Sequence, residues 1–131
     1  MKGSYSYIDI AREDLRAAGE MLRAGLYNHA VRLCQQYVEK VLKECLEKHG
    51  AGEEDLRLQH SHRVFRLAER AAELRGLTFT RTEKAFFREL TDYYFDTNYP
   101  GEDYIEVTAL QAAQAHEETL RFQTDYEARL C

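Results

Sequence analysis

Residues 27–48 read YNHAVRLCQQYVEKVLKECLEK, and this segment carries the strongest structural signal in the chain. Its apolar residues recur at steps of three and four, the spacing that places side chains on one side of an α-helix. These positions are Ala30, Val31, Cys34, Tyr37, Val38, Val41, Leu42, Cys45 and Leu46. So wide a stripe is typical of a central helix covered on more than one side. We predict that this helix is the most buried element, with Val38, Val41, Leu42 and Cys45 in the core.

Helical periodicity continues on both sides of this segment. It predicts helices over residues 7–24 and 61–75, which end at Gly25 and Gly76 as helices commonly do at glycine. Residues 50–59 are polar and acidic, and we expect them to form a loop.

The C-terminal part of the chain predicts two more helices. One begins after a cap at Thr80 or Thr82 and ends at the turn-forming residues 96–101 (DTNYPG). The other begins near Glu102 or Asp103, where acidic residues suit the helix dipole, and runs to about residue 130. Its expected apolar stripe contains Ile105, Ala109, Leu110, Ala112, Ala113, His116, Leu120 and Phe122.

The links between these helices are short, which favours antiparallel neighbours. No internal repeat or shift in composition marks a boundary within the chain. We therefore predict a single domain over residues 1–131, with an all-α fold: an antiparallel up-and-down bundle of four to five helices.

The charge balance argues against a general polyanion-binding protein. The chain has 23 acidic and 18 basic side chains, for a net charge of −5. Because affinity for nucleic acid depends on contacts between cations and phosphates, any such role requires a local basic patch. We see no apolar segment of a secretory signal near Met1 and no run of about 20 apolar residues that could span a bilayer. We expect a cytoplasmic protein that does not bind a membrane.

Three stretches together resemble the HEPN domain family. The first is residues 11–46, where CQQYVEKVLK (34–43) is similar to the second-helix signature of the family. The second is HRVFRL (62–67), and the third is LTDYYFDTNYP (90–100), similar to a tyrosine-rich helix that ends in Arg-Tyr-Pro. The resemblance implies a bundle of four or five helices that commonly forms dimers. It also implies a small nucleotidyltransferase as a frequent partner, and several relatives are ribonucleases.

Nuclease members of this family use an arginine followed four to six residues later by a histidine. Such a pair cleaves RNA without metal, because histidine transfers a proton and arginine stabilises the phosphate charge. In this sequence Asn98 occupies the arginine position, and residues 99–107 contain no histidine. The spacing does occur at Arg57 and His62, before the third expected helix. The sequence therefore favours a protein without this activity, with a ribonuclease that uses Arg57 and His62, or another such pair, as the alternative.

We expect no metal and no cofactor. His60 and His62 have only His49, Glu53, Glu54 and Asp55 near them in sequence, and a stable zinc site needs three or four convergent ligands. The three cysteines lack CxxC spacing, and Cys34 and Cys45 lie in the apolar stripe as expected for small core residues.

The helix expected over residues 61–75 has a basic side. Arg63, Arg66 and Arg70 fall on one side of it, and His60 and His62 precede them. Such a surface is either solvated and balanced by nearby acids, or a contact site for RNA, a nucleotide or an acidic partner.

Aromatic residues are concentrated between positions 86 and 104. Adjacent residues such as those of Tyr93-Tyr94-Phe95 cannot all point to one narrow core face, so some are expected at an interface, where aromatics are enriched. We assign Phe87, Tyr94, Tyr99 and Tyr104 to a dimer or partner interface.

The predicted function is a HEPN-like subunit that forms a homodimer and binds a protein partner, with nucleotide or RNA contact. A purely structural helical adaptor is a further alternative.

Overall fold

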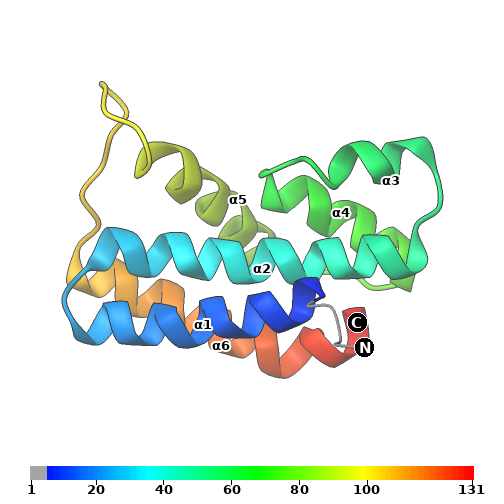
Figure 1. Cartoon of the computed structure of the whole chain (residues 1–131), viewed down its shortest axis with the longest axis horizontal. Coiled ribbons are helices and arrows are strands. Elements are labelled where there is room, and N and C mark those ends of the chain that lie inside the picture. The colour runs from blue at the N-terminus through cyan, green and yellow to red at the C-terminus, as the bar shows by residue number, and fades with distance from the viewer. Residues whose placement is uncertain (1–5) are drawn as a thin grey trace, which may run out of the picture.

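The computed structural model describes residues 6–131. Its helices, coloured along the chain in Figure 1, are α1 (Tyr7–Arg23), α2 (Tyr27–His49), α3 (Glu53–Leu58), α4 (Val64–Arg75), α5 (Arg81–Asp96) and α6 (Ala109–Leu130). None of the described residues belongs to a strand. The prediction of an all-α fold is confirmed. The short helix α3 occupies the segment that was expected to be a loop.

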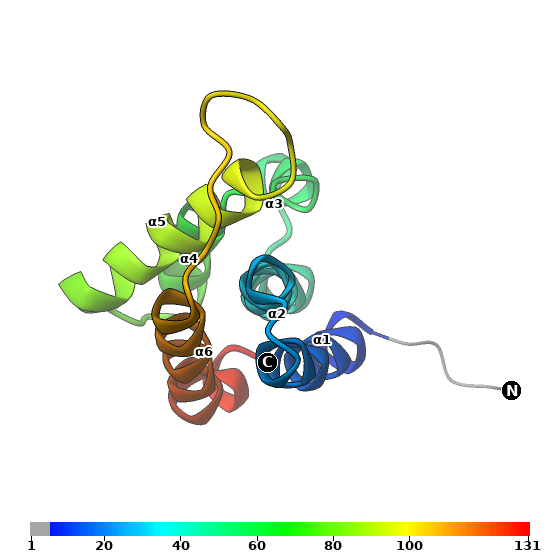
Figure 2. The ribbon, with the colours of Figure 1, turned by 90° about the vertical axis from the view of Figure 1, so that its left-hand side faces the viewer.

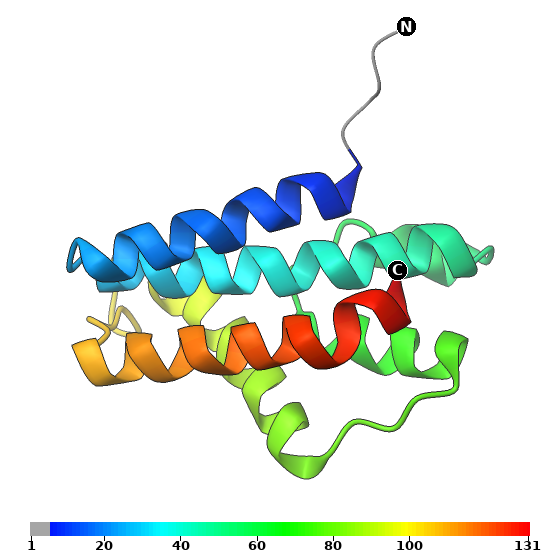
Figure 3. The same ribbon diagram turned by 90° about the horizontal axis from the view of Figure 1, so that it is seen from below.

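Helix α2 lies at the centre of the molecule. Seen along its axis, α1 and α6 lie on one side of it, and α3, α4 and α5 lie on the other (Figure 2). Helices α1, α2 and α6 lie alongside one another, whereas α5 crosses α6 obliquely (Figure 3). The helices on the α1 side are therefore roughly aligned, whereas α5 is inclined to them (Figure 3).

The apolar stripe of α2 is buried between these two groups of helices. Val38, Val41, Leu42 and Cys45 are all fully buried, which confirms the predicted core face. Polar residues of α2 are buried as well, because neighbours cover so much of its surface; they are Gln35, Glu39, Lys43 and Glu44.

Two predicted helix ends are confirmed, each with glycine in the left-handed region of backbone conformation. Gly25 has a φ of 78° between α1 and α2, and Gly76 has a φ of 65° after α4. Glycine adopts this conformation without the steric cost that a Cβ atom imposes. These two glycines allow the sharp reversals that bring α2 back along α1 and turn the chain from α4 towards α5.

The predicted start of the last helix is wrong. Helix α6 begins at Ala109, because Thr108 caps it: the Thr108 hydroxyl accepts a hydrogen bond from Gln111 N, and the Gln111 side chain accepts one from Thr108 N. Residues 97–108 form a connection without regular secondary structure instead, with turns in its first half (Figure 1).

The predicted apolar stripe of this helix is also partly wrong. Leu110 is 67% exposed, and Ala109, Ala113 and Leu120 are exposed too. The side that faces the core is shifted around the helix and contains Ala112, Ala115, Thr119, Phe122, Tyr126 and Leu130. Within residues 6–131, we find no helix whose length and apolar character together would let it span a membrane.

Candidate functional site

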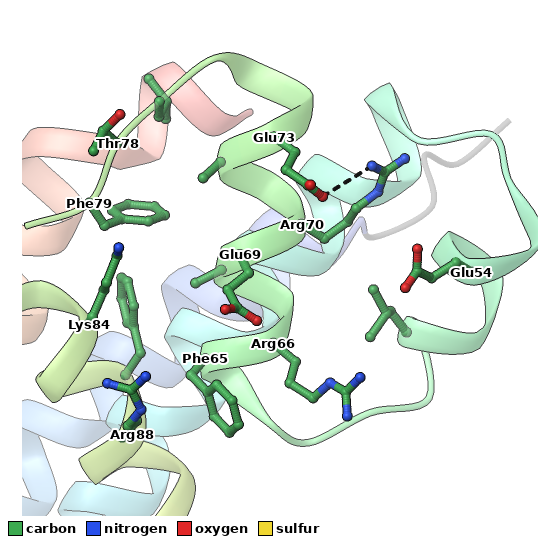
Figure 4. Close-up of a pocket in the computed structure, with 15 residues that line it drawn as sticks. Glu54, Phe65, Arg66, Glu69, Arg70, Glu73, Thr78, Phe79, Lys84 and Arg88 are labelled. Carbon is green, nitrogen blue, oxygen red and sulfur yellow. Dashed lines mark hydrogen bonds and ion pairs between the residues drawn. The ribbon is translucent and has the colours of Figure 1, made fainter.

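A groove runs over the outer side of α4, between α3 and α5 (Figure 4). Its volume is about 410 Å³. The apolar residues that line it are Leu58, Phe65, Ala68, Ala72, Leu77, Phe79 and Phe87. Phe79 and Phe87 are buried at its base and pack edge to face, with ring centroids 4.9 Å apart. The groove therefore has a firm aromatic base.

Cationic side chains approach this groove from two helices. Arg66 and Arg70 come from α4, and Lys84 and Arg88 come from α5 (Figure 4). The guanidinium carbon of Arg88 lies 5.7 Å from the ring centroid of Phe65, a cation–π distance. The structure thus places part of the predicted basic side of α4 in a groove that α5 completes.

Arg70 differs from the other three cations because it is bound by acidic side chains. Its Nε donates to Asp55 Oδ1 at 2.6 Å and its Nη2 to Asp55 Oδ2 at 3.2 Å, and Nη1 also reaches Glu73. These hydrogen bonds from Arg70 hold the pKa of the nearly buried Asp55 carboxyl below its usual value. Arg70 therefore ties α4 to α3.

The remaining charges of the groove are less constrained. Within residues 6–131, Arg66, Lys84 and Arg88 form no ion pair. Glu54 and Glu69 also line the groove, and among the described residues they form no ion pair either. The local charge is therefore mixed, with a small excess of positive charge on the α5 side.

The other predicted contact residues lie at a second place, where the segment before α4 meets α2 and α5. His62 Nδ1 lies 3.1 Å from Glu39 Oε1, and its ring stacks on Tyr94 with centroids 4.5 Å apart. The Arg63 guanidinium lies over the Phe95 ring at 5.3 Å, while His60 is exposed in the turn after α3. The five predicted residues thus divide between two environments.

The pair Arg57 and His62 is not assembled by any contact that the structure describes. Arg57 forms an exposed ion pair with Glu53 at 3.9 Å, and His62 binds Glu39. A proton-transfer pair requires both groups within reach of one substrate. The spacing in sequence is therefore not matched by an interaction in space.

A different arginine–histidine pair was missed by the sequence reasoning. Arg32 Nη2 lies 2.6 Å from His29 Nδ1, and Arg32 Nη1 donates to the carbonyl of Thr97. Thr97 is next to Asn98, the residue at the position where the family resemblance implies arginine in nuclease members. The three-residue spacing of His29 and Arg32 on one side of a helix was the available signal, but their approach to residue 97 depends on the fold.

The four aromatic residues predicted to lie at an interface differ in how deeply the structure buries them. Phe87 is buried in the core, where it packs on Phe79 and Phe122, so its assignment to an interface is wrong. Tyr94 is half-buried against His62. Tyr99 is 61% exposed and Tyr104 is 44% exposed.

The connection that carries these tyrosines is bound to the start of α2. Asn28 Nδ2 donates to Tyr104 Oη at 3.1 Å and to the Ile105 carbonyl at 3.0 Å, and Asn28 Oδ1 accepts from Val107 N at 2.7 Å. A single side chain thus fixes three points of this segment. Nothing in the sequence singled out Asn28, because its hydrogen-bond partners lie 76 to 79 residues away and no local motif marks it.

Neither metal nor thiol chemistry has an evident site in the described part of the chain. Among residues 6–131, no three His, Cys, Asp or Glu side chains lie close enough together to hold a metal ion. Burial raises the pKa of both Cys34 and Cys45 to about 11, which disfavours the reactive thiolate at neutral pH.

Comparison with known proteins gives one match. The family model for the HEPN domain matches residues 5–127 of the 131-residue chain. No curated protein and no solved structure matches it.

Proposed function

Since this chain belongs to the HEPN domain family, we propose that it is a non-catalytic subunit that self-associates through one end of its bundle and binds a protein partner. The observation that carries the proposal is a concentration of exposed apolar side chains. We call this the aromatic end surface, and it consists of Leu26, Phe95, Tyr99, Tyr104, Ile105 and Leu110. The turn between α1 and α2, the 97–108 connection and the start of α6 lie at this end of the bundle (Figures 1 and 3).

The aromatic end surface is held in place before any partner binds. Besides the Asn28 contacts, Ile105 N donates to the Asp96 carbonyl at 3.0 Å. A surface that is already ordered loses less conformational entropy on association. Large exposed aromatic side chains are also the residues that most often anchor protein interfaces.

Acidic residues border this surface, namely Glu102, Asp103 and Glu106. In a two-fold symmetric dimer the same surface meets itself, so these acids repel one another. Salt screens such repulsion. Self-association is therefore expected to strengthen as the salt concentration increases. Binding to a basic partner protein is expected to weaken, because salt also screens the attraction between opposite charges.

The test is the molar mass of the protein in solution. Light scattering during size-exclusion chromatography is expected to give a dimer for the wild type and a monomer for Tyr99→Ser combined with Leu110→Ser. Leu56→Ser combined with Leu120→Ser removes two exposed leucines elsewhere and should leave the dimer intact. A monomeric wild type at high micromolar concentration contradicts self-association.

The family resemblance supports a small nucleotidyltransferase as the protein partner. The basic residues in and just before α4, Arg63, Arg66, Arg70, His60 and His62, are the proposed contacts for a nucleotide or RNA. Arg66→Glu is the informative variant for nucleotide titration, because Arg66 is exposed and free of ion pairs among residues 6–131. Arg70→Glu would also break the ion pair with Asp55, so a loss of nucleotide binding in that variant could not be separated from a loss of stability.

A ribonuclease is the second candidate, favoured by the contact between His29 and Arg32 beside Thr97. This pair supplies the two residue types of metal-free RNA cleavage next to the position of Asn98. RNA cleavage that His29→Ala and Arg32→Ala both abolish would establish it.

A further inference from the structure

The groove over α4 combines two features that ligand sites commonly share, an apolar base and a few polar groups at its edge. We propose that it binds a small organic anion built on a flat aromatic ring, such as an aromatic carboxylate. This inference is independent of self-association, because the groove and the aromatic end surface have no residue in common.

The dimensions of the groove suit a small molecule. Its volume of about 410 Å³ falls within the range of roughly 300–1,000 Å³ that is usual for such sites. Phe65 is half-buried and lines the groove with buried Phe79 (Figure 4), and buried Phe87 lines it as well. A flat ring can stack on Phe65 or meet the other rings edge to face, as aromatic pairs prefer.

The anionic group of the ligand has two cations on the α5 side. Lys84 and Arg88 are one helical turn apart, so both project from the same side of α5 towards α4 (Figure 4). The planar guanidinium of Arg88 can donate two parallel hydrogen bonds to a carboxylate while its face remains near Phe65. The aromatic ring of the ligand therefore lies against the apolar base of the groove, and its anionic group lies at the α5 edge.

Glu69 makes the site selective for the orientation and the charge of the ligand. It lines the groove from α4, and within the described residues it forms no ion pair. Its carboxylate repels an anion that approaches on the α4 side. Arg66, the cation of α4 that is unpaired within residues 6–131, extends away from Lys84 and Arg88 (Figure 4), so the α5 side is favoured. Because Glu54 also contributes negative charge, the groove suits an anion with one or two charges better than a polyanion.

The experiment is a nuclear magnetic resonance titration of the full chain with 2-naphthoate and with its uncharged analogue 2-naphthamide. We expect saturable binding of naphthoate to one site, with a Kd on the order of 0.1–1 mM for a ligand of this size. Shift changes should centre on α4, α5 and residues 77–79. The amide should bind at least about tenfold more weakly, since it lacks the charge that Arg88 and Lys84 recognise.

Three variants separate this site from general attraction of an aromatic anion. Lys84→Glu combined with Arg88→Glu should raise the Kd at least about tenfold, and Glu69→Gln should lower it several-fold. Arg16→Glu combined with Arg121→Glu makes the same change in net charge elsewhere and should leave the Kd unchanged. Circular dichroism verifies the helix content of each variant, and Lys84→Gln with Arg88→Gln replaces the charge reversal if that variant does not fold. Equal binding of the amide, shift changes centred elsewhere, or an unchanged Kd in the α5 variant would overturn the proposal.

Discussion

His62 Nδ1 lies 3.1 Å from Glu39 Oε1, and this contact joins the segment before α4 to the covered side of α2. Glu39 also accepts hydrogen bonds from Gln35 Nε2 at 2.6 Å and from Lys43 Nζ at 2.9 Å. Glu39, Gln35 and Lys43 are all buried. A buried carboxylate is tolerated only when its oxygens are bound in this way.

Removal of the Glu39 carboxylate should therefore destabilise the protein strongly. Glu39→Ala leaves the buried Lys43 ammonium without its partner, and such a loss costs about 3–5 kcal/mol in the free energy of unfolding. Urea denaturation measures it, with the exposed Glu54→Ala as control. Replacing both partners, as Glu39→Leu with Lys43→Met, should recover most of the loss. If the free energy of unfolding of Glu39→Ala lies within about 1 kcal/mol of the wild-type value, water must reach the pair of Glu39 and Lys43.

Leu42→Ala tests the core face of α2. Leu42 is fully buried, so the truncation removes apolar contacts and leaves a cavity, at a cost of about 2–5 kcal/mol. Leu56→Ala, on the exposed side of α3 and outside the aromatic end surface, should cost less than about 0.5 kcal/mol. Both values come from urea denaturation. Similar losses for the two leucines would contradict the assignment of core and surface.

The helices were predictable from sequence wherever one local signal dominated. The stripe around Leu42 is so wide that it defined the central helix, and Gly25 and Gly76 marked two ends because only glycine favours their backbone conformation. The start of α6 had two competing signals, the acids at 102–103 and the Thr108 cap. The structure uses the cap, while residue 105 and its neighbours pair with Asn28, a contact that local sequence does not reveal.

The candidate site was less predictable, because it depends on which helices become neighbours. The sequence indicated that Arg66 and Arg70 share one side of α4. It could not indicate that Arg70 binds Asp55, or that Arg88 of α5 completes the groove. The burial of Phe87 has the same origin, since its environment is set by Phe79 and by the crossing of α5 over the core.

Asp55 should make the stability depend on pH. Its pKa is lowered in the folded protein by the hydrogen bonds from Arg70, so the unfolded chain binds a proton more readily. The resulting stabilisation is fully present above the unfolded pKa of about 3.9, and it is lost as pH falls through the lower folded value. Asp55→Asn removes this contribution.

The measurement is urea denaturation of wild type and Asp55→Asn at pH 7 and at about pH 2.5, below the unfolded pKa. The variant should be less stable at pH 7, and the difference should shrink at the acidic pH. Asp125→Asn, at an exposed position, serves as the control. A difference that does not change with pH would show that Asp55 acts through its shape and neutral hydrogen bonds alone.

Asn28→Ala should loosen the connection that carries the aromatic end surface. It removes the acceptor for Val107 N and the donor to the Ile105 carbonyl, with an expected cost of about 0.5–1.5 kcal/mol. Hydrogen exchange at the Val107 amide should become faster. Asn98→Ala, which removes only the bond to the Tyr94 carbonyl, should leave that amide unchanged. Equal exchange in wild type and Asn28→Ala would mean that other contacts hold the segment.

The isolated protein should not cleave RNA. Asn98 carries no charge to offset a phosphate, and its side chain donates to the Tyr94 carbonyl. Loss of a preorganised charge-stabilising group typically costs about 10²–10³ in rate, and loss of proton transfer by histidine about 10²–10⁴. These losses need not multiply, because groups that act as a unit are not additive.

The decisive assay uses single-stranded RNA of mixed sequence without added metal. It compares wild type with His29→Ala, Arg32→Ala, His62→Ala and Arg57→Ala. We expect no cleavage by any of them, because Asn98 occupies the expected arginine position and Arg57 and His62 do not contact each other. Cleavage lost in the first two variants would place an active site beside Asn98, and cleavage lost in the last two would place it before α4. Cleavage that survives all four would indicate a contaminating nuclease or a further arginine–histidine pair.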